Sequence, residues 1–459
     1  MTSSASTDPA SSRPDPVALL RSQAYLRLLV FAAVLGVPVS AAAFGFLKLV
    51  SLMQGWVFTD LPEGLGFHGA PVWWPVPLLA VAGVLVGLTI RYLPGRGGES
   101  PAEGFKPHGA PSPVELPGIT LAALATLTFG VVLGPEMPLI ALGGGLAVWA
   151  VRLARRDTPA SAIAVLASAG GFAAISTLLG SPILGAFLLM EVAGIGGPML
   201  GLVLVPGLLA AGIGSLIFVG LDAWTGFGTF SLALPDLPKF ARPDLAQFGW
   251  ALVVGVAAAL LGVGIRQLAL LVRRAVERRV VLLTPVIGLV IAGLAIAYAE
   301  ATGKSSSDVL FSGQTAMGPL ISNSAAYSVG ALVLLVACKG LAYGASLSSF
   351  RGGPVFPAMF LGAAGGIAMS HLPGLPLVPA VAMGIGAMSV AMLGLPLTSV
   401  LLATLLLLSD GLAVMPLVIV AVVVSYVISA RLRRPAPAAP AQAPARAPAT
   451  PVEEPARTP

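Results

Sequence analysis

One carboxylate stands inside a long apolar stretch of this sequence, in the segment GPEMP that contains Glu136. An ionisable side chain in apolar surroundings is costly, so such residues are candidate functional sites. Proline suits the first turn of a helix and glycine permits close backbone approach, so this string predicts a helix start. A helix start offers unpaired N–H groups and a partial positive charge, which bind anions. The predicted chemistry is reversible anion binding, with Glu136 able to occupy the anion position itself and act as a gate.

The same string occurs a second time, which indicates an internal repeat. Both GPEMP (134–138) and GPVFP (353–357) continue in the form G-P-x-x-P-x-x-x-L-G, at an offset of 219 residues. A second pair, GSPI (180–183) and GLPL (394–397), follows in the same order at an offset of 214 residues. Matched Gly/Pro interruptions in two halves predict a binding site at the midplane of a repeat-built transporter.

Two simpler explanations compete with this hypothesis. The strings could be ordinary Gly/Pro kinks in membrane helices, and Glu136 could be a fixed capping carboxylate. Two matched pairs favour a site over isolated kinks. Neither string contains Lys or Arg, which favours release of a bound anion. Val355 stands where Glu136 stands in the first string, so the backbone pattern does not require the carboxylate.

The composition places these strings in a membrane. Of 459 residues, 57% are hydrophobic and only 10% are charged, and the mean hydropathy is +0.95. Soluble domains carry about 25% charged residues, so the chain is predicted to be an all-α polytopic membrane protein. The arginines cluster beside apolar blocks, which is typical of cytoplasmic flanks and predicts no nucleic-acid partner.

Other classes of protein are disfavoured by what the chain contains. A single cysteine, Cys338, cannot form an intramolecular disulfide, and the histidines His68, His108 and His371 are too far apart in the sequence to suggest a metal cluster. We therefore predict no metal and no cofactor. A membrane-embedded enzyme is the rival class, but no H-E-x-x-H string is present and no G-x-S-x-G string lies near His371.

The repeat and the breaks divide the chain into five predicted segments. These are an N-terminal disordered tail (1–23), a first membrane half (24–225), a connecting loop (226–246), a second membrane half (247–432) and a Pro/Ala-rich disordered tail (433–459). Inverted topology is the commoner arrangement of such halves. Lys339, Asp308 and Asp410 are expected near helix ends, where they would snorkel or cap.

The ordered motifs resemble the CLC family of chloride channels and chloride/proton antiporters over nearly all of 25–432. GVVLGPEMPLIALGGG, LASAGGFAAISTLLGSPILGAFLLMEV and GASLSSFRGGPVFPAMFLGAAGG are similar to the family's conserved stretches, and VLFSGQTAM and LGLPLTSVLL follow in the expected order. The resemblance implies a CLC-type fold, a homodimer with one anion pathway per subunit, and chloride or another small anion as the transported species. It also implies a multi-pass protein of the lipid bilayer. Twenty of the 25 basic residues are arginine, and alanine and proline are abundant, which favours a bacterial source and hence the inner membrane.

The resemblance also implies roles for individual residues. Glu136 matches the gating glutamate. The GGESP segment best matches the family's first anion loop, with Gly98 where the family has a coordinating serine, unless a shift brings Ser100 into place. Met137 replaces a glycine beside the gate. The residues expected to line the anion site are Gly98, Ser100, Pro101, Gly134, Pro135, Met137, Pro138, Gly353, Pro354, Val355, Phe356 and Pro357.

The position of the family's cytoplasmic proton relay is occupied by Val192, which predicts that this relay is lost. Glu191 lies one residue earlier and would point about 100° away around a helix. The family's inner-gate tyrosine has no clear match, because Tyr426 lies too early in the last apolar block. We therefore favour a gated, passive chloride channel. A chloride/proton antiporter with an atypical relay and a fluoride-selective transporter of the same fold are the alternatives, and a purely structural membrane scaffold would explain neither Glu136 nor the repeated breaks.

Overall fold

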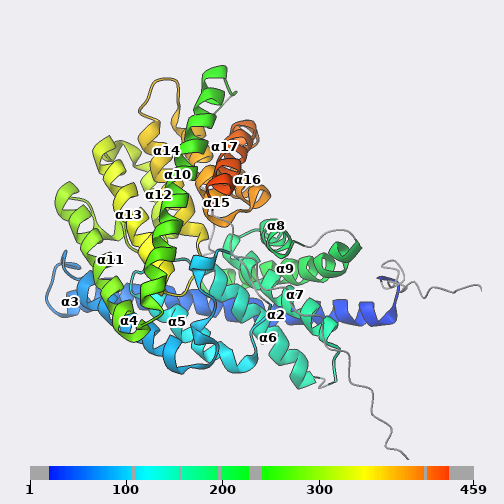
Figure 1. Ribbon diagram of the computed structural model, residues 1–459. Coiled ribbons are helices and arrows are strands. Elements are labelled where there is room, and N and C mark those ends of the chain that lie inside the picture. The colour runs from blue at the N-terminus through cyan, green and yellow to red at the C-terminus, as the bar shows by residue number, and fades with distance from the viewer. Residues whose placement is uncertain are drawn as a thin grey trace, which may run out of the picture.

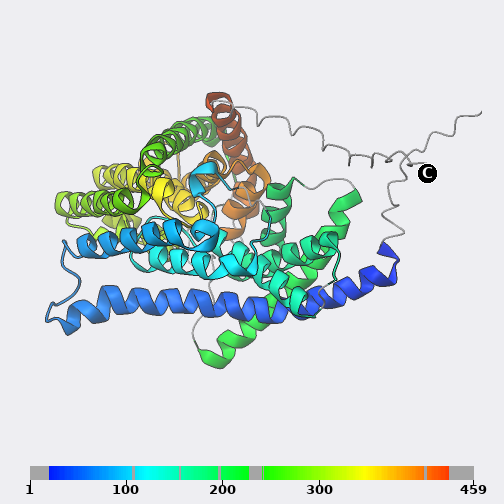
Figure 2. The same ribbon diagram turned by 60° about the horizontal axis from the view of Figure 1, so that its bottom comes forward.

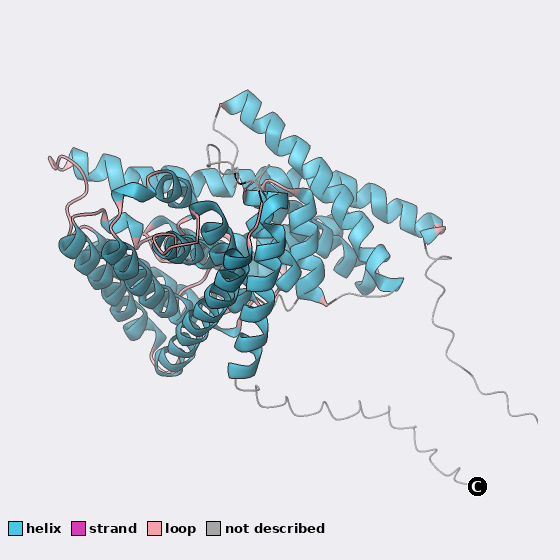
Figure 3. Ribbon diagram, turned by 90° about the horizontal axis from the view of Figure 1, so that it is seen from above, coloured by secondary structure: helices cyan, strands magenta, loops and turns pink. Residues whose placement is uncertain are grey.

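The computed structural model is built from helices throughout its described residues (Figure 3). These residues are 20–105, 109–154, 157–194, 198–226, 240, 242–407 and 411–433. The two predicted tails lie almost wholly outside these ranges, as do His108, Asp410 and most of the predicted connecting loop. The all-α prediction is confirmed.

The chain forms long apolar helices joined by short helical turns. The first half contains α2 (Gln23–Gly55), the π-helix η1 (Trp56–Asp60), α3 (Leu61–Gly64), α4 (Pro75–Tyr92), η2 (Pro94–Gly97), η3 (Pro101–Glu103), η4 (Pro113–Glu115), α5 (Leu116–Thr128), α6 (Glu136–Ala154), α7 (Ala160–Leu179), α8 (Pro182–Ala193) and α9 (Pro198–Thr225). The second half contains α10 (Leu245–Val276), α11 (Val280–Thr302), η5 (Ser306–Asp308), α12 (Gln314–Ser322), η6 (Ser324–Ala326), α13 (Val329–Ser349), α14 (Val355–Met369), α15 (Leu377–Leu393), α16 (Pro396–Leu406) and α17 (Gly411–Leu432).

Long apolar helices and an apolar exterior show that this is a multi-pass membrane protein. Among the described residues, nine helical segments are long and apolar enough to cross a bilayer. Large apolar side chains face outward along these helices: Val30 is 63% exposed, Leu271 63% and Leu216 73%. A soluble surface rarely carries so many, because water disfavours extended apolar patches, whereas lipid does not.

The repeat is visible in the packing as well as in the sequence. In the first half α6 and α7 cross where Gly143 meets Gly170, and in the second half α14 and α15 cross where Gly362 meets Gly384. These glycines stand at the offsets of 219 and 214 residues found in the sequence. A Cβ atom on any of the four would collide with the carbonyl oxygen of its partner. The absence of side chains therefore permits the same close helix crossing in both halves.

The two halves are interlocked rather than separate. Helix α11 of the second half packs along α4 of the first half at the lower left of Figure 1. Gly288 lies against the backbone of Leu79, and Gly83 lies against the backbone of Pro285. Helix α2 runs along one side of the molecule, as Figure 2 shows. As a consequence, the first turns of the two helices that begin at the GP strings lie next to each other, between the halves.

Candidate functional site

The two GP strings meet at their first glycines. The Gly134 N–H donates to the Gly353 carbonyl oxygen at 2.8 Å, and the Gly353 N–H donates to the Gly134 carbonyl oxygen at 2.6 Å. This is an isolated antiparallel pair between residues that are equivalent in the repeat. An antiparallel pair of equivalent residues implies a local two-fold axis between them, as an inverted repeat requires. Pro135 and Pro354 follow the pair directly, and α6 and α14 begin one residue later.

Glu136 reaches across this junction to the start of α14. Its side chain is completely buried, and its Oε1 accepts a hydrogen bond from the Phe356 N–H at 2.9 Å. Its Oε2 has no hydrogen-bond partner among the described residues. The carboxylate thus lies at the positive end of a helix that begins in the other half, where an anion would bind.

Side chains of α13 hold the two loops beside this carboxylate. The Tyr343 hydroxyl donates to the Pro354 carbonyl oxygen at 2.7 Å. The Ser346 hydroxyl accepts from the Val132 N–H at 3.2 Å and donates to the Ala342 carbonyl oxygen at 2.7 Å. Sequence reasoning did not identify these two residues, although their spacing of three residues on a helix places them on one face. Their role here is to position the backbone around Glu136.

The backbone is unusual at the start of the GGESP segment, which resembles the first anion loop, and just before it. Gly95, Arg96, Gly97 and Gly98 all have positive φ, with Arg96 at 49°. A left-handed conformation costs a residue with a side chain about 1–2 kcal/mol, so contacts elsewhere must hold Arg96 in place. The Arg351 Nε donates to the Arg96 carbonyl oxygen at 3.3 Å and is one such contact.

A cavity of about 510 Å³ lies beside this loop. Gly98, Met137 and Pro138 line it together with Arg351 and Gly352. It therefore approaches both strings, at the residues next to Glu136 and Gly353. Ser100 and Pro101 do not line it: Ser100 precedes η3 and Pro101 begins it. Pro357 and Val355 are buried in the first turn of α14.

The structure corrects the expectation for Lys339. This residue lies in the middle of α13 and is completely buried, so it neither snorkels nor caps its helix. Its ammonium group donates to the carbonyl oxygens of residues 308–311 at 2.9–3.3 Å, and it lies 4.3 Å from the centre of the Phe360 ring. A buried ammonium requires such acceptors. The expectation failed because the acceptors come from a loop about thirty residues away in sequence.

Asp308 is expected near a helix end and ends the short helix η5. Its Oδ2 accepts hydrogen bonds from the Tyr327 hydroxyl at 3.1 Å and from the Tyr298 hydroxyl at 3.3 Å. Burial raises the pKa of Asp308, and these two hydrogen bonds oppose that rise by lowering the same pKa. The loop at residues 308–311 is thus held through both its side chains and its carbonyl groups.

Glu191 and Val192 lie near the end of α8. Glu191 accepts the Leu397 N–H at 2.9 Å on one carboxylate oxygen, and the Thr398 N–H and hydroxyl at 2.8 and 2.7 Å on the other. Both oxygens are therefore engaged at the start of α16, in the other half. Val192 is half-buried and packs against the apolar core.

Comparison with known proteins is consistent with this architecture. The family model described as voltage gated chloride channel matches residues 82–430. The ion-transport protein YfeO of Salmonella choleraesuis is 31% identical over 76% of this chain and 81% of its own length, and that of Salmonella schwarzengrund is 32% identical over the same shares.

Solved structures show the same fold. A slow cyanobacterial Cl⁻/H⁺ antiporter superposes with a TM-score of 0.71 at 20% identity, over 88% of this chain and 95% of that one. A CLC-type fluoride/proton antiporter superposes with a TM-score of 0.65 at 21% identity, over 89% and 96% of the two chains. At these identities the likeness concerns the fold alone.

Proposed function

The chain belongs to the voltage gated chloride channel (CLC) family and transports anions, and we propose that Glu136 is the gate of its pathway. It is not an enzyme. The observation that carries the proposal is the position of the Glu136 carboxylate on the Phe356 N–H, at the start of α14. A transported anion and this carboxylate compete for the same N–H groups, so the pathway conducts only when the carboxylate has left.

The anion site of this proposal consists of the backbone around Glu136. Gly134 and Pro135 lead into α6, and Gly353 and Pro354 lead into α14, which begins with Val355, Phe356 and Pro357 and whose Phe356 N–H holds the carboxylate. Met137, Pro138 and Gly98 form the wall of the adjoining cavity. Ser100 and Pro101, predicted for the same site, do not line this cavity.

We favour passive, channel-type transport over proton-coupled exchange. Val192 carries no titratable group, and both oxygens of its neighbour Glu191 are engaged by α16, so neither residue offers a free carboxylate for a proton relay. A chloride/proton antiporter with another relay, and a fluoride-selective transporter, are the competing functions. The matching folds of a chloride/proton and a fluoride/proton antiporter make both worth testing.

The test is anion efflux from proteoliposomes, with the membrane voltage set by valinomycin and external pH recorded. Glu136→Gln keeps the side-chain shape but carries no charge at any pH, whereas the Glu136 carboxylate loses its charge when it is protonated. We therefore expect Glu136→Gln to conduct chloride faster than wild type and without dependence on pH. The matched control is Glu300→Gln, because Glu300 is an exposed carboxylate on α11. Wild-type and Glu300→Gln protein should behave alike.

Three other results would change the proposal. Identical flux in wild type and Glu136→Gln would show that Glu136 is not the gate. Protons driven uphill by a chloride gradient show exchange through a relay other than Val192. Fluoride flux in the absence of chloride flux shows the fluoride-selective alternative.

The proposal includes a homodimer with one pathway per subunit, in the inner membrane of a bacterium. The CLC resemblance supports the dimer, and the Salmonella relatives support a bacterial source. Cross-linking in native membranes tests the oligomeric state.

A further inference from the structure

Arg351 is a half-buried cation that forms no close salt bridge among the described residues, although the carboxylates of Glu103 and Glu277 attract it at longer range. Its guanidinium donates from Nε to the Arg96 carbonyl oxygen at 3.3 Å and from Nη1 to the Phe350 carbonyl oxygen at 3.3 Å. These two hydrogen bonds, both to backbone carbonyl oxygens, use the Nε and Nη1 atoms. A guanidinium carries five N–H donors, so most of its donor capacity is left for another acceptor.

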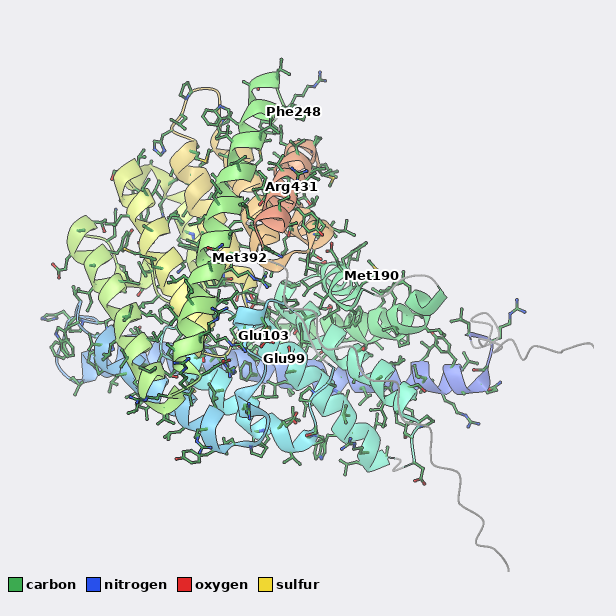
Figure 4. All side chains as sticks on the ribbon, viewed as in Figure 1. Glu99, Glu103, Met190, Phe248, Met392 and Arg431 are labelled. Atoms are coloured by element: carbon green, nitrogen blue, oxygen red, sulfur yellow. The ribbon has the colours of Figure 1, made fainter. Side chains whose placement is uncertain are left out.

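The neighbouring arginine on α10 is neutralised. The Arg273 guanidinium pairs with Glu103 at 2.6 Å and with Glu277 at 2.5 Å. Figure 4 places Glu103 and Glu99 beside the lower part of α10. Glu115, which also lines the cavity, accepts the Ser112 N–H in a capping box. The acidic residues Glu103, Glu277 and Glu115 thus have structural partners. None of them forms a salt bridge with Arg351, although Glu103 and Glu277 attract it at longer range.

The surroundings of Arg351 fit a ligand larger than a halide. The cavity beside it measures about 510 Å³ and is lined on one side by the glycine-rich loop with positive φ. Backbone without side chains can approach a ligand closely. A planar guanidinium binds planar oxyanions through two parallel hydrogen bonds, a geometry that a spherical halide cannot use.

We propose that Arg351 makes this cavity a binding site for a planar oxyanion of the nitrate or carboxylate class, next to the Glu136 gate. This inference deepens the proposed function, because it rests on an anion pathway that the cavity adjoins. An anion bound in this cavity compensates the charge of Arg351. It also lies close to both strings, because Met137 of the first string and Gly352, which precedes the second, line the cavity. The site concentrates oxyanions at the gate and favours them over chloride.

The test measures binding directly, so that it does not depend on transport. Isothermal titration calorimetry of the purified protein with sodium nitrate and with sodium chloride, at constant ionic strength, gives both affinities. Wild type should bind nitrate more tightly than chloride. Arg351→Lys keeps the charge and loses the planar fork, so nitrate affinity should fall about tenfold while chloride affinity changes little. Arg351→Gln should lose nitrate binding.

The control is Arg91→Gln, which removes an exposed arginine at the end of α4 and should leave nitrate affinity unchanged. Because Arg351 also contacts the Arg96 loop, the melting temperature of each variant is recorded, and the Arg351→Lys comparison is made between folded proteins. Equal nitrate affinity in wild type, Arg351→Lys and Arg351→Gln overturns the proposal, as does tighter binding of chloride than nitrate by wild type.

The two proposals fail separately. If nitrate binding depends on Arg351 but flux does not change in Glu136→Gln, the oxyanion site stands and the gate proposal fails. If chloride flux depends on Glu136 but nitrate binding does not depend on Arg351, the gate proposal stands and the oxyanion site fails.

Discussion

At the scale of single residues, glycine determines where a carboxylate can lie in this molecule. Gly134 and Gly353 sit so close to Glu136 that a Cβ on either would collide with its carboxylate. Gly353 does not have positive φ, so alanine is compatible with its backbone conformation. Steric exclusion, rather than backbone strain, is therefore the reason for glycine at this position.

This leads to a prediction for Gly353→Ala. The added methyl group should displace the Glu136 carboxylate from the start of α14, so anion flux should rise and lose its dependence on pH, as in Glu136→Gln. The matched control is Gly365→Ala in α14, the helix that begins just after Gly353, at a position where a Cβ meets nothing within 4 Å. Proteoliposome chloride efflux measures both.

A double variant separates displacement of the gate from general damage. Gly353→Ala should change flux in the wild-type background. It should have little further effect in the Glu136→Gly background, because Glu136→Gly removes the side chain that the added methyl group would meet. Equal effects of Gly353→Ala in both backgrounds would contradict the steric explanation.

The sequence allowed some of these residues to be predicted and not others. Glu136 and both glycine strings are local patterns, and the repeat makes them visible twice. Arg351 stands only two residues before the second string, but its partner at Arg96 is 255 residues distant. Lys339 was misjudged for the same reason, because nothing near it in sequence shows which carbonyl groups surround it. Interactions that depend on long-range packing leave no local pattern.

At the scale of helices, the ends of α8 and α16 show how one half completes the other. Ser181 precedes α8 and accepts the Leu184 N–H at 3.3 Å. The equivalent residue before α16 is Leu395, which has no side-chain oxygen to cap the helix. Glu191 of α8 supplies the missing acceptors from the other half. The sequence indicated both positions as matched Gly/Pro interruptions, whereas this capping interaction joins residues more than 200 positions apart.

We predict that Glu191→Ala lowers stability more than Ser181→Ala. Glu191 accepts three hydrogen bonds at α16, whereas the Ser181 side chain accepts one at α8. Loss of a helix cap costs about 0.5–2 kcal/mol, and hydrogen bonds to a charged group are at the strong end. Thermal unfolding in detergent compares the two variants.

A second variant of this residue, Glu191→Gln, tests the role of Glu191 in transport. If Glu191 is a cap, Glu191→Gln should leave the ratio of protons to chloride unchanged in the flux assay. Loss of proton movement in Glu191→Gln, with unchanged thermal stability, would show a relay function instead.

At the scale of the whole molecule, we expect the two halves to depend on each other for folding. The helix start that holds the Glu136 carboxylate belongs to the second half, and α4 and α11 pack through Gly83 and Gly288. Division into halves is visible in the sequence because the strings repeat. Their interlocking is not, since it depends on glycines that face a helix of the other half.

The last prediction concerns the halves as separate chains. We expect fragments 1–234 and 235–459, divided between α9 and α10, to give no Glu136-dependent chloride flux when each is expressed alone. Expressed together they should restore it, because the contacts between α4 and α11 and between Gly134 and Gly353 need no covalent link. An isolated fragment would expose glycine-lined surfaces that fit only the other half, so it should aggregate or be degraded. Flux from co-expressed fragments should change with Glu136→Gln as it does in the intact chain. A first fragment that conducts alone, with the same response to Glu136→Gln, would show that α14 is dispensable and that the gate does not lie between the halves.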